Sequence, residues 1–275
     1  AKNLPMELFP LADAIITQNA ASHRGATLGR ILKKPVIHYV HNDSLHAEKM
    51  VWQYTDFAIY NTDWIKKKFE SRGTPTPGLV LHPAVNPEKY KIQRNRGSKY
   101  ITLVNLSKGG STVTYDKGWR TFFELARRNP DEAFLGVRGA YGDQAFEDLP
   151  NVTYMDHTED IREAFKKSRV VVVPSQYESF GRVAVEAAAS GIPSICTETL
   201  GTREAMGTSC LYSSFEDFDD WHSRLNETLN HWDVYSEAAK ARSAFNWERT
   251  QREIEELGVV MAILETSGLK GLNGL

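Results

Sequence analysis

The sequence predicts an α/β fold built on doubly wound parallel sheets, and two observations support this prediction. Short apolar runs alternate with segments of helical periodicity along nearly the whole chain. Some of the runs are unbroken and β-branched, as in Val170 to Val173, which is typical of strands buried on both faces of a parallel sheet. No internal repeat is found in the sequence. Regular alternation of strands and helices is the pattern of a doubly wound sheet.

The expected elements follow directly from this alternation. Strands are expected at residues 14–17, 36–40, 57–60, 78–81, 100–104, 133–137, 152–154, 170–173 and 194–196. Helices are expected near residues 22–32, 44–54, 63–71, 118–128, 159–168, 181–190 and 216–229. Gly191 and Pro193 follow one of these helices as residues that stop a helix.

The composition is that of an ordinary soluble protein. Of the 275 residues, 41% are hydrophobic and 25% are charged, which suits one large domain or two medium ones. The formal net charge of −2 disfavours a protein whose main task is to neutralise nucleic acid phosphates. Cys196 and Cys210 lack metal-ligand spacing and fit a reducing compartment. No spanning stretch or signal peptide is found, so we expect a cytoplasmic protein, with peripheral membrane contact left open.

A domain boundary is expected between residues 82 and 98. The segment contains Pro83 and Pro87, and then a polar, basic stretch from Lys91 to Ser98. Prolines and polar residues between strand patterns are typical of an interdomain connection, although a surface loop within one domain is the alternative. A complete set of strand–helix units follows the segment, which favours the connection. We therefore expect an N-terminal domain over residues 1–88 and a C-terminal domain over residues 89–250.

The most informative segment follows the strand at residues 170–173. A loop there carries Glu178, and a helix begins near Gly181. Ligands of open α/β sheets bind beyond the carboxyl ends of the strands, so the chain itself places Glu178 at such a site. The free backbone N–H groups of Phe180, Gly181 and Arg182 at the helix start suit hydroxyl or phosphate oxygens.

Glu186 lies inside the same helix. Taken alone, it would be interpreted as part of a solvated helix face. The neighbouring residues are small or apolar, namely Val183, Ala184, Ala187 and Ala188, so the helix is packed on this side. A carboxylate in such surroundings indicates a binding role. Glu178 and Glu186 are then spaced to hold two separate hydroxyl pairs of one ligand.

The segments Pro174–Ala187 and Ala189–Pro193 closely resemble the donor-site motif of the GT4 glycosyltransferases. The resemblance extends over roughly residues 78–265, and more loosely over the whole chain. It implies a GT-B fold, in which two Rossmann-like domains face a cleft. It also implies that residues 251–275 form a C-terminal helix that crosses back to the N-terminal domain.

The resemblance further assigns roles to individual residues. Glu186 matches the glutamate that binds the ribose hydroxyls of a nucleotide, and Glu178 matches the glutamate that contacts the transferred sugar. Lys117, at the start of the helix after the strand at 100–104, matches the lysine that binds the diphosphate, where the helix N-terminus adds favourable electrostatics. Around the two glutamates, the expected donor-binding residues are Glu178, Ser179, Phe180, Gly181, Arg182 and Glu186.

The sequence departs from the GT4 pattern after the strand at 100–104. The family's arginine is missing, and Asn105 stands in its place. Lys108 or Arg138 are the candidates to replace that arginine at the phosphates, and an exposed loop lysine is the alternative for Lys108. His157 is a candidate contact for the base, with a surface loop histidine as its alternative.

In the first domain, His41 ends the strand at 36–40 and matches a family histidine that faces the sugar. Asn42 and Asp43 are candidates for acceptor hydroxyls, or for an ordinary helix N-cap. The strand and glycine-rich loop that begin a GT4 chain are not found here, so we expect an incomplete N-terminal domain, either a fragment or a natural minimal version.

The function implied by the resemblance is an enzyme, a retaining glycosyltransferase of hexosyltransferase type. It would move a sugar from a nucleoside diphosphate sugar to an acceptor hydroxyl, with His41, Lys117 and Glu178 as its catalytic residues. Nothing is identified that resembles the Asp-x-Asp motif of metal-dependent transferases, so we expect no metal and no cofactor.

Several alternatives remain open. The first is a non-catalytic sugar-nucleotide-binding protein or a subunit of a glycosylation complex, and the second is a GT-B sugar-nucleotide epimerase. The expected partner is the nucleotide-sugar donor. The acceptor is left open: a glycan, a lipid, a protein or a small molecule is favoured over a nucleic acid. The oligomeric state is also left open.

Overall fold

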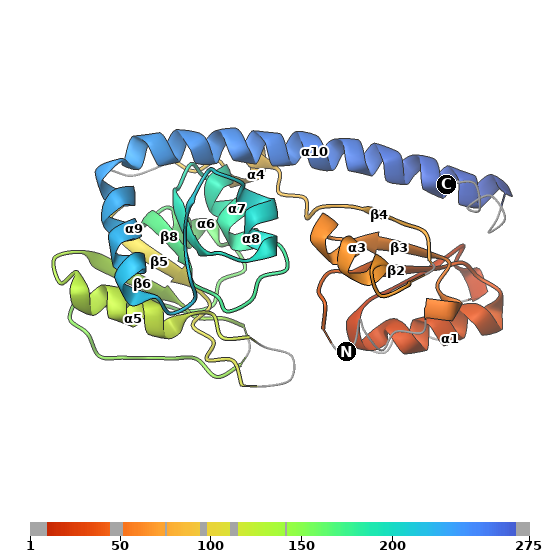
Figure 1. Ribbon diagram of the computed structural model, residues 1–275, viewed down its shortest axis with the longest axis horizontal. Coiled ribbons are helices and arrows are strands. Elements are labelled where there is room, and N and C mark those ends of the chain that lie inside the picture. Colours follow the sequence, from red (N-terminus) through yellow and green to blue (C-terminus); the bar gives the residue numbers. More distant parts are fainter. Residues whose placement is uncertain are drawn as a thin grey trace. The chain divides into compact units, whose positions relative to one another are not determined.

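The computed structural model describes residues 10–44, 52–74, 76–93, 98–110, 115–140 and 142–267. The chain forms two compact units (Figure 1). Unit 1 comprises Ala1–Pro83 and Arg249–Leu275, and unit 2 comprises Ala84–Glu248. Both divisions fall before the expected boundaries after residues 88 and 250. Unit 1 is therefore assembled from both ends of the sequence, whereas unit 2 is continuous.

Unit 1 contains a four-stranded parallel sheet in the order β1-β2-β3-β4. Its elements are β1 (Ile15–Thr17), a 3-10 turn η2 (Asn19–Ala21), α1 (Ser22–Leu32), β2 (Val36–Val40), a 3-10 turn η3 (Trp52–Tyr54), β3 (Phe57–Tyr60), α3 (Asp63–Glu70) and β4 (Gly78–Val80).

The core of unit 1 has two sides, because residues alternate between the faces of each strand. On one face, Val40, Ala58 and Tyr60 pack with Ile65 and Phe69 of α3. On the other face, Val260 of helix α10 (Trp232–Ser267) joins Ile37, Phe57 and Ile59 of β2 and β3. The final helix thus supplies part of the core that covers the sheet of unit 1.

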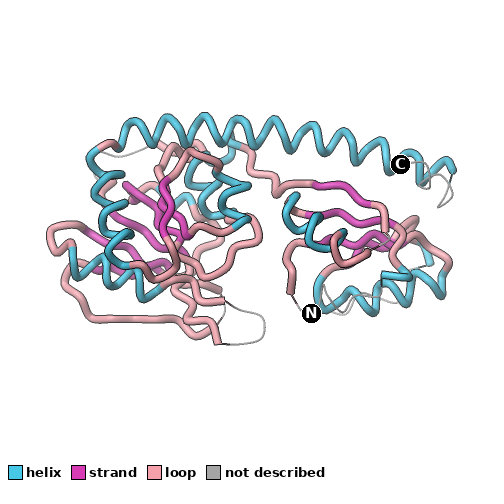
Figure 2. The backbone as a smooth tube through the Cα atoms, viewed as in Figure 1, coloured by secondary structure: helices cyan, strands magenta, loops and turns pink. Residues whose placement is uncertain are grey.

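Unit 2 contains a six-stranded parallel sheet in the order β10-β9-β8-β5-β6-β7, seen as magenta strands in Figure 2. The strands are β5 (Tyr100–Val104), β6 (Ala133–Val137), β7 (Val152–Met155), β8 (Ser168–Val173), β9 (Ser194–Thr197) and β10 (Leu211–Ser213). The helices are α4 (Pro87–Tyr90), α5 (Trp119–Arg128), α6 (Arg162–Phe165), α7 (Arg182–Ala189), α8 (Leu200–Met206), α9 (Phe218–Asn230) and the first part of α10.

Strand β8 shows why an unbroken valine run belongs at the centre of this sheet. Val170 and Val172 pack into the core that contains the aromatic residues of α5 and Trp221 of α9. Val171 and Val173 pack on the opposite side with the small residues of α7. All four side chains are buried. The predicted parallel-sheet α/β architecture is confirmed in both units, and the strand order of unit 2 reverses direction at β5 and β8 as in a doubly wound sheet.

Some elements differ from the sequence-based expectation. The helix expected at 159–168 is reduced to α6, because β8 already begins at Ser168. Most of the helix expected at 44–54 lies outside the described residues, and η3 occupies its end. Strand β10 was not expected, and the final helix is one continuous element, α10. In the described part of the chain, no helix has both the length and the apolar character needed to span a membrane.

Candidate functional site

A cavity of about 360 Å³ opens in unit 2 at the carboxyl ends of the central strands. The last residues of β5, β6 and β8, which are Val104, Val137 and Val173, line it. The chain leaves β5 in one direction along the sheet and β8 in the other, so the cavity lies at the topological switch point where open α/β sheets bind ligands. The other lining residues are Leu103, Asn105, Lys117, Arg138, Gly139, Ala140, His157, Thr158, Ile161, Val172, Ser175, Glu178, Arg182, Val183 and Glu186.

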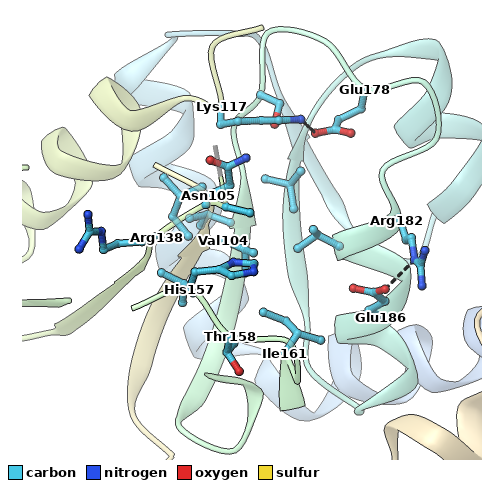
Figure 3. A pocket seen from close by; sticks show the side chains of 18 residues that line it. Val104, Asn105, Lys117, Arg138, His157, Thr158, Ile161, Glu178, Arg182 and Glu186 are labelled. Carbon is cyan, nitrogen blue, oxygen red and sulfur yellow. Dashed lines mark hydrogen bonds and ion pairs between the residues drawn. The ribbon is translucent and has the colours of Figure 1, made fainter. Parts of the chain in front are cut away.

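The cavity brings together seven of the site residues expected from the sequence (Figure 3). They are Asn105, Lys117, Arg138, His157, Glu178, Arg182 and Glu186. Ser179, Phe180 and Gly181 are not among the lining residues, although they connect Glu178 to Arg182. Lys108 lines a different cavity together with Asp116 and Arg120. His41 belongs to unit 1.

Lys117 and Glu178 form an ion pair on one side of the cavity (Figure 3), with 2.7 Å between Nζ and Oε1. Two neighbouring contacts hold their segments side by side. The backbone N–H of Gln176 donates to the carbonyl of Asp116 at 2.9 Å, and the rings of Tyr115 and Tyr177 stack with centroids 4.5 Å apart. The opposed charges are therefore fixed by backbone and ring contacts as well as by their own attraction.

Gly118 explains how the two segments approach so closely. It adopts φ of +81°, a left-handed conformation that favours glycine, and it is the N-cap of α5. A Cβ atom at this position would lie 2.1 Å from the carbonyl oxygen of Pro174. The structure therefore requires the glycine, which admits the loop after β8, and the lysine beside it reaches Glu178.

Asp116 stabilises the start of α5 through contacts with Gly118 and Arg120. Its Oδ1 accepts a hydrogen bond of 2.6 Å from the backbone N–H of Gly118, and its Oδ2 lies 3.1 Å from Nη1 of Arg120. Burial raises the pKa of Asp116, and the Gly118 N–H and the Arg120 charge oppose that rise. One backbone donor at this helix start is therefore already occupied by the protein.

Glu186 lies on the opposite side of the cavity and is 8% exposed. Its Oε1 accepts hydrogen bonds from Nε of Arg182 at 2.7 Å and from the phenol of Tyr90 at 2.8 Å. Burial raises the pKa of Tyr90, and the negative charge of Glu186 adds to the rise. Sequence reasoning missed Tyr90, because it stands 96 residues before Glu186 and no spacing connects the two.

Arg138 and Asn105 are engaged with protein groups at the edge of the cavity. Arg138 points away from the two glutamates in Figure 3, and its Nη1 lies 3.1 Å from Oδ1 of Asp156. Asn105 has a φ of +73°, and its Oδ1 accepts from the backbone N–H of Ser107 at 3.1 Å. Asn105 thus stabilises the turn of the loop after β5.

His41 lies at the carboxyl end of β2 in unit 1, among asparagine side chains. Nδ2 of Asn19 is 2.8 Å from Nε2 of His41, and Nδ2 of Asn61 donates to the His41 carbonyl at 2.9 Å. Burial lowers the pKa of His41 below its ordinary value of 6.5, so the imidazole is neutral at pH 7. Asn19 and Asn61 were not expected from the sequence, since each follows a different strand.

The expectation that nothing resembles Asp-x-Asp needs a correction, because Asp217-Phe218-Asp219 has this spacing. The structure gives these aspartates helix-start roles. Asp217 caps α9 by accepting from the backbone N–H of Asp220 at 3.2 Å, and Asp219 pairs with Arg128. Neither aspartate lines the cavity.

Comparisons with known proteins match the unit that contains this cavity. Residues 120–231 match the family described as "Glycosyl transferases group 1". The chain is 36% identical over 97 residues to a D-inositol 3-phosphate glycosyltransferase of Geodermatophilus obscurus, which covers 34% of this chain and 22% of that protein. It is 30% identical over 210 residues to the mannosylfructose-phosphate synthase of Agrobacterium fabrum, covering 66% of this chain and 46% of that protein.

The fold comparison covers more of the chain. The structure resembles that of Anabaena HepE in complex with UDP, with a TM-score of 0.72 and 18% identity, over 92% of this chain and 80% of that chain. The chain spans less than half the length of the two curated relatives named above. The family match within unit 2, the relatives and the shared architecture together show that this chain carries a glycosyl transferases group 1 domain in a GT-B fold.

Proposed function

We propose that this chain acts as a retaining glycosyltransferase, which moves a sugar from a nucleoside diphosphate sugar to an acceptor hydroxyl without an essential metal ion. One observation carries the proposal. The cavity at the switch point of a group 1 domain holds a lysine–glutamate pair on one side and a second glutamate, Glu186, on the other. The three groups suit the three polar parts of one donor: its diphosphate, its sugar and its ribose.

The arrangement accounts for how a diphosphate leaving group would be stabilised. Lys117 precedes Gly118, the N-cap of α5, so its ammonium group and the positive end of that helix act on the same region. Negative charge that develops on a departing diphosphate is best stabilised by groups that are already in position. The Gly118 and Tyr115 contacts hold Lys117 in this way before any ligand arrives.

The proposal that no metal is essential rests on the partners of the carboxylates. Glu178 is paired with Lys117, and Glu186 is paired with Arg182. Both acidic side chains in the cavity are thus paired with protein cations, and these positive charges oppose the binding of a divalent cation beside them. In this arrangement Lys117 supplies the positive charge that a metal ion supplies elsewhere.

We retain His41 as a residue that contacts sugar or acceptor hydroxyls and Arg138 as a candidate for the phosphates, and the structure supports the first more strongly than the second. His41 is a neutral imidazole beside the amide side chains of Asn19 and Asn61, which suits hydrogen bonds to sugar or acceptor hydroxyls. Arg138 would have to leave Asp156 to reach a phosphate, so it ranks behind Lys117. We also propose a cytoplasmic setting, which the two buried free cysteines, Cys196 and Cys210, support.

Binding and product analysis test the proposal. The chain is titrated with UDP-, GDP- and ADP-linked sugars, with UDP first because the structural neighbour HepE is described with UDP. At least one donor is expected to raise the thermal unfolding midpoint, since a ligand that binds only the folded state stabilises it. Lys117→Ala should abolish that shift, and the control Lys240→Ala, which changes an exposed i,i+3 pair, should leave it intact.

Product analysis separates the alternatives. Transfer or slow hydrolysis of the sugar with retained anomeric configuration supports the transferase. Free epimerised nucleotide sugar would instead identify an epimerase, and binding without turnover would identify a sugar-nucleotide binder. If no nucleotide sugar binds the wild-type chain, the proposal is wrong.

A further inference from the structure

Tyr90 lies at the end of α4, a short helix between the first unit boundary and the sheet of unit 2. Asn86 caps this helix, because its side chain accepts from the backbone N–H of Glu88 at 2.9 Å. Tyr90 and Ile92 pack against the apolar core beneath α7. The segment is therefore fixed on α7 by contacts that do not involve the phenol oxygen.

The phenol and the carbonyl of Tyr90 both contact one face of α7, at Glu186 and at the C-cap residue Ser190. Arg182, Glu186 and Ser190 follow one another at intervals of four residues, which places them on the same face of the helix. Ser190 Oγ donates to the Tyr90 carbonyl at 2.9 Å, and the Tyr90 phenol donates to Glu186 Oε1 at 2.8 Å. The carbonyl contact holds the backbone in register, so the phenol is aimed at the carboxylate.

The two carboxylate oxygens of Glu186 differ in how many hydrogen bonds they accept from the protein. Oε1 accepts from both Tyr90 and Arg182. Within the described residues, Oε2 accepts no hydrogen bond from the protein, and Glu186 lines the cavity. Two donors on one oxygen fix the rotation of the carboxylate group and present the other oxygen as an acceptor for a ligand hydroxyl.

We propose that Tyr90 is a positioning residue for Glu186 and thereby sets the affinity of this site for the ribose hydroxyls of the nucleotide. The inference rests on the proposed function, in which Glu186 binds ribose. It adds a residue outside the donor-site motif, contributed by the segment that enters unit 2. The raised pKa of Tyr90 keeps its phenol protonated, and hence a donor, throughout the neutral range.

Tyr90→Phe tests the role, because the ring and its packing remain and only the hydroxyl is lost. Calorimetric titrations compare UDP, GDP and ADP with their 2′,3′-dideoxy counterparts, which lack both ribose hydroxyls. For the nucleotide that binds wild type, Tyr90→Phe should raise the Kd about tenfold, as expected for the loss of one hydrogen bond to a charged group. For the dideoxy counterpart, the change should be less than about twofold, because little ribose contact remains to lose.

Tyr235→Phe is a matched control. The phenol of Tyr235 also donates to a glutamate, Glu227, at 2.6 Å, and neither residue lines the cavity. This variant should leave both titrations unchanged. Thermal unfolding of both variants shows whether either has lost its fold.

The outcomes separate the positioning role from a structural one. An equal loss of affinity for the ribose and dideoxy ligands would show that Tyr90 only supports the fold. An unchanged affinity for the natural nucleotide would show that Tyr90 has no role in binding. Either result overturns the inference. If wild type binds none of the three nucleotides, the proposed function fails together with the inference. Wild-type binding with an unaffected Tyr90→Phe variant contradicts the inference alone.

Discussion

Lys117 and Glu178 are joined by an ion pair of 2.7 Å although they stand 61 residues apart in the chain. Each is the residue that sequence resemblance assigns to a different part of the donor, the diphosphate and the sugar. Without a ligand, each neutralises the other. A donor that enters this site would therefore have to share Lys117 with Glu178, and the charge of Glu178 opposes the binding of a bare nucleoside diphosphate.

A first prediction follows from this competition. Glu178→Gln should bind UDP about three- to tenfold more tightly than wild type, because a negative charge beside the diphosphate is removed and Lys117 is released. The same variant should lose turnover. Calorimetric titration measures the affinity. Glu198→Gln, which changes an exposed pair with Arg203, should bind UDP as wild type does. Weaker UDP binding by Glu178→Gln would contradict the competition.

A second prediction concerns Gly118. Gly118→Ala should lower the free energy of unfolding by at least about 2 kcal/mol, since it combines a left-handed backbone with overlap of a backbone oxygen. Nucleotide affinity should fall with it, because Lys117 moves. The comparison is Gly258→Ala on the exposed face of α10, where nothing lies within 4 Å of the added carbon. That change should raise the free energy of unfolding by up to about 1 kcal/mol. Chemical denaturation checks both, and equal effects would contradict the close approach.

A third prediction concerns pH and His38. Burial, followed by repulsion from His41, lowers the pKa of His38 from 6.5 to about 4. Between these values the unfolded chain binds a proton that the folded chain does not, so the free energy of unfolding falls as pH decreases from 6.5 towards 4. The full loss is about 3 kcal/mol.

Denaturation at a series of pH values measures this slope. His38→Gln should reduce it, whatever its effect on stability at pH 8. The lowered pKa of His41 acts in the same direction and remains in the variant. A slope that is unchanged by His38→Gln would show that other groups titrate.

A fourth prediction concerns metal ions. Turnover, once a donor is identified, should persist after treatment with EDTA, because Lys117 supplies the positive charge at the diphosphate. Asp219→Asn removes one carboxylate of Asp217-Phe218-Asp219 and its exposed pair with Arg128, and it should also leave turnover unchanged. Loss of activity on chelation, restored by a divalent cation, would contradict the proposed mechanism.

The parts of the fold that sequence analysis captured are those with a local signal. Val170 to Val173 is buried on both faces, so its composition alone reveals a central strand. Glu178 and Glu186 follow that strand within one strand–loop–helix unit, and their placement in one cavity was foreseeable for the same reason. Local order in the chain is sufficient where one unit supplies the whole feature.

Contacts between segments that are distant in the chain leave no local pattern in the sequence. The hydrogen bond from Tyr90 to Glu186 depends on how α4 packs on α7, and a tyrosine in a linker carries no mark of it. The separation of Lys108 from the cavity and the turn of Arg138 towards Asp156 depend on loop conformation. Side-chain direction in loops is set by neighbours that the sequence pattern does not identify.

Val260 closes the core of unit 1 from a helix that begins in unit 2. His82 and Glu253 join the same two parts of unit 1, with 2.6 Å between Nδ1 and Oε1. During synthesis on the ribosome, the strands of unit 1 emerge first, yet the residues that complete their core emerge only after all of unit 2. Until α10 has been synthesised, the face of the unit 1 sheet that packs on Val260 lacks this cover. The full sequence of unit 2 is available before that point. The same arrangement makes the order of translation differ from the order in which the two cores can be completed.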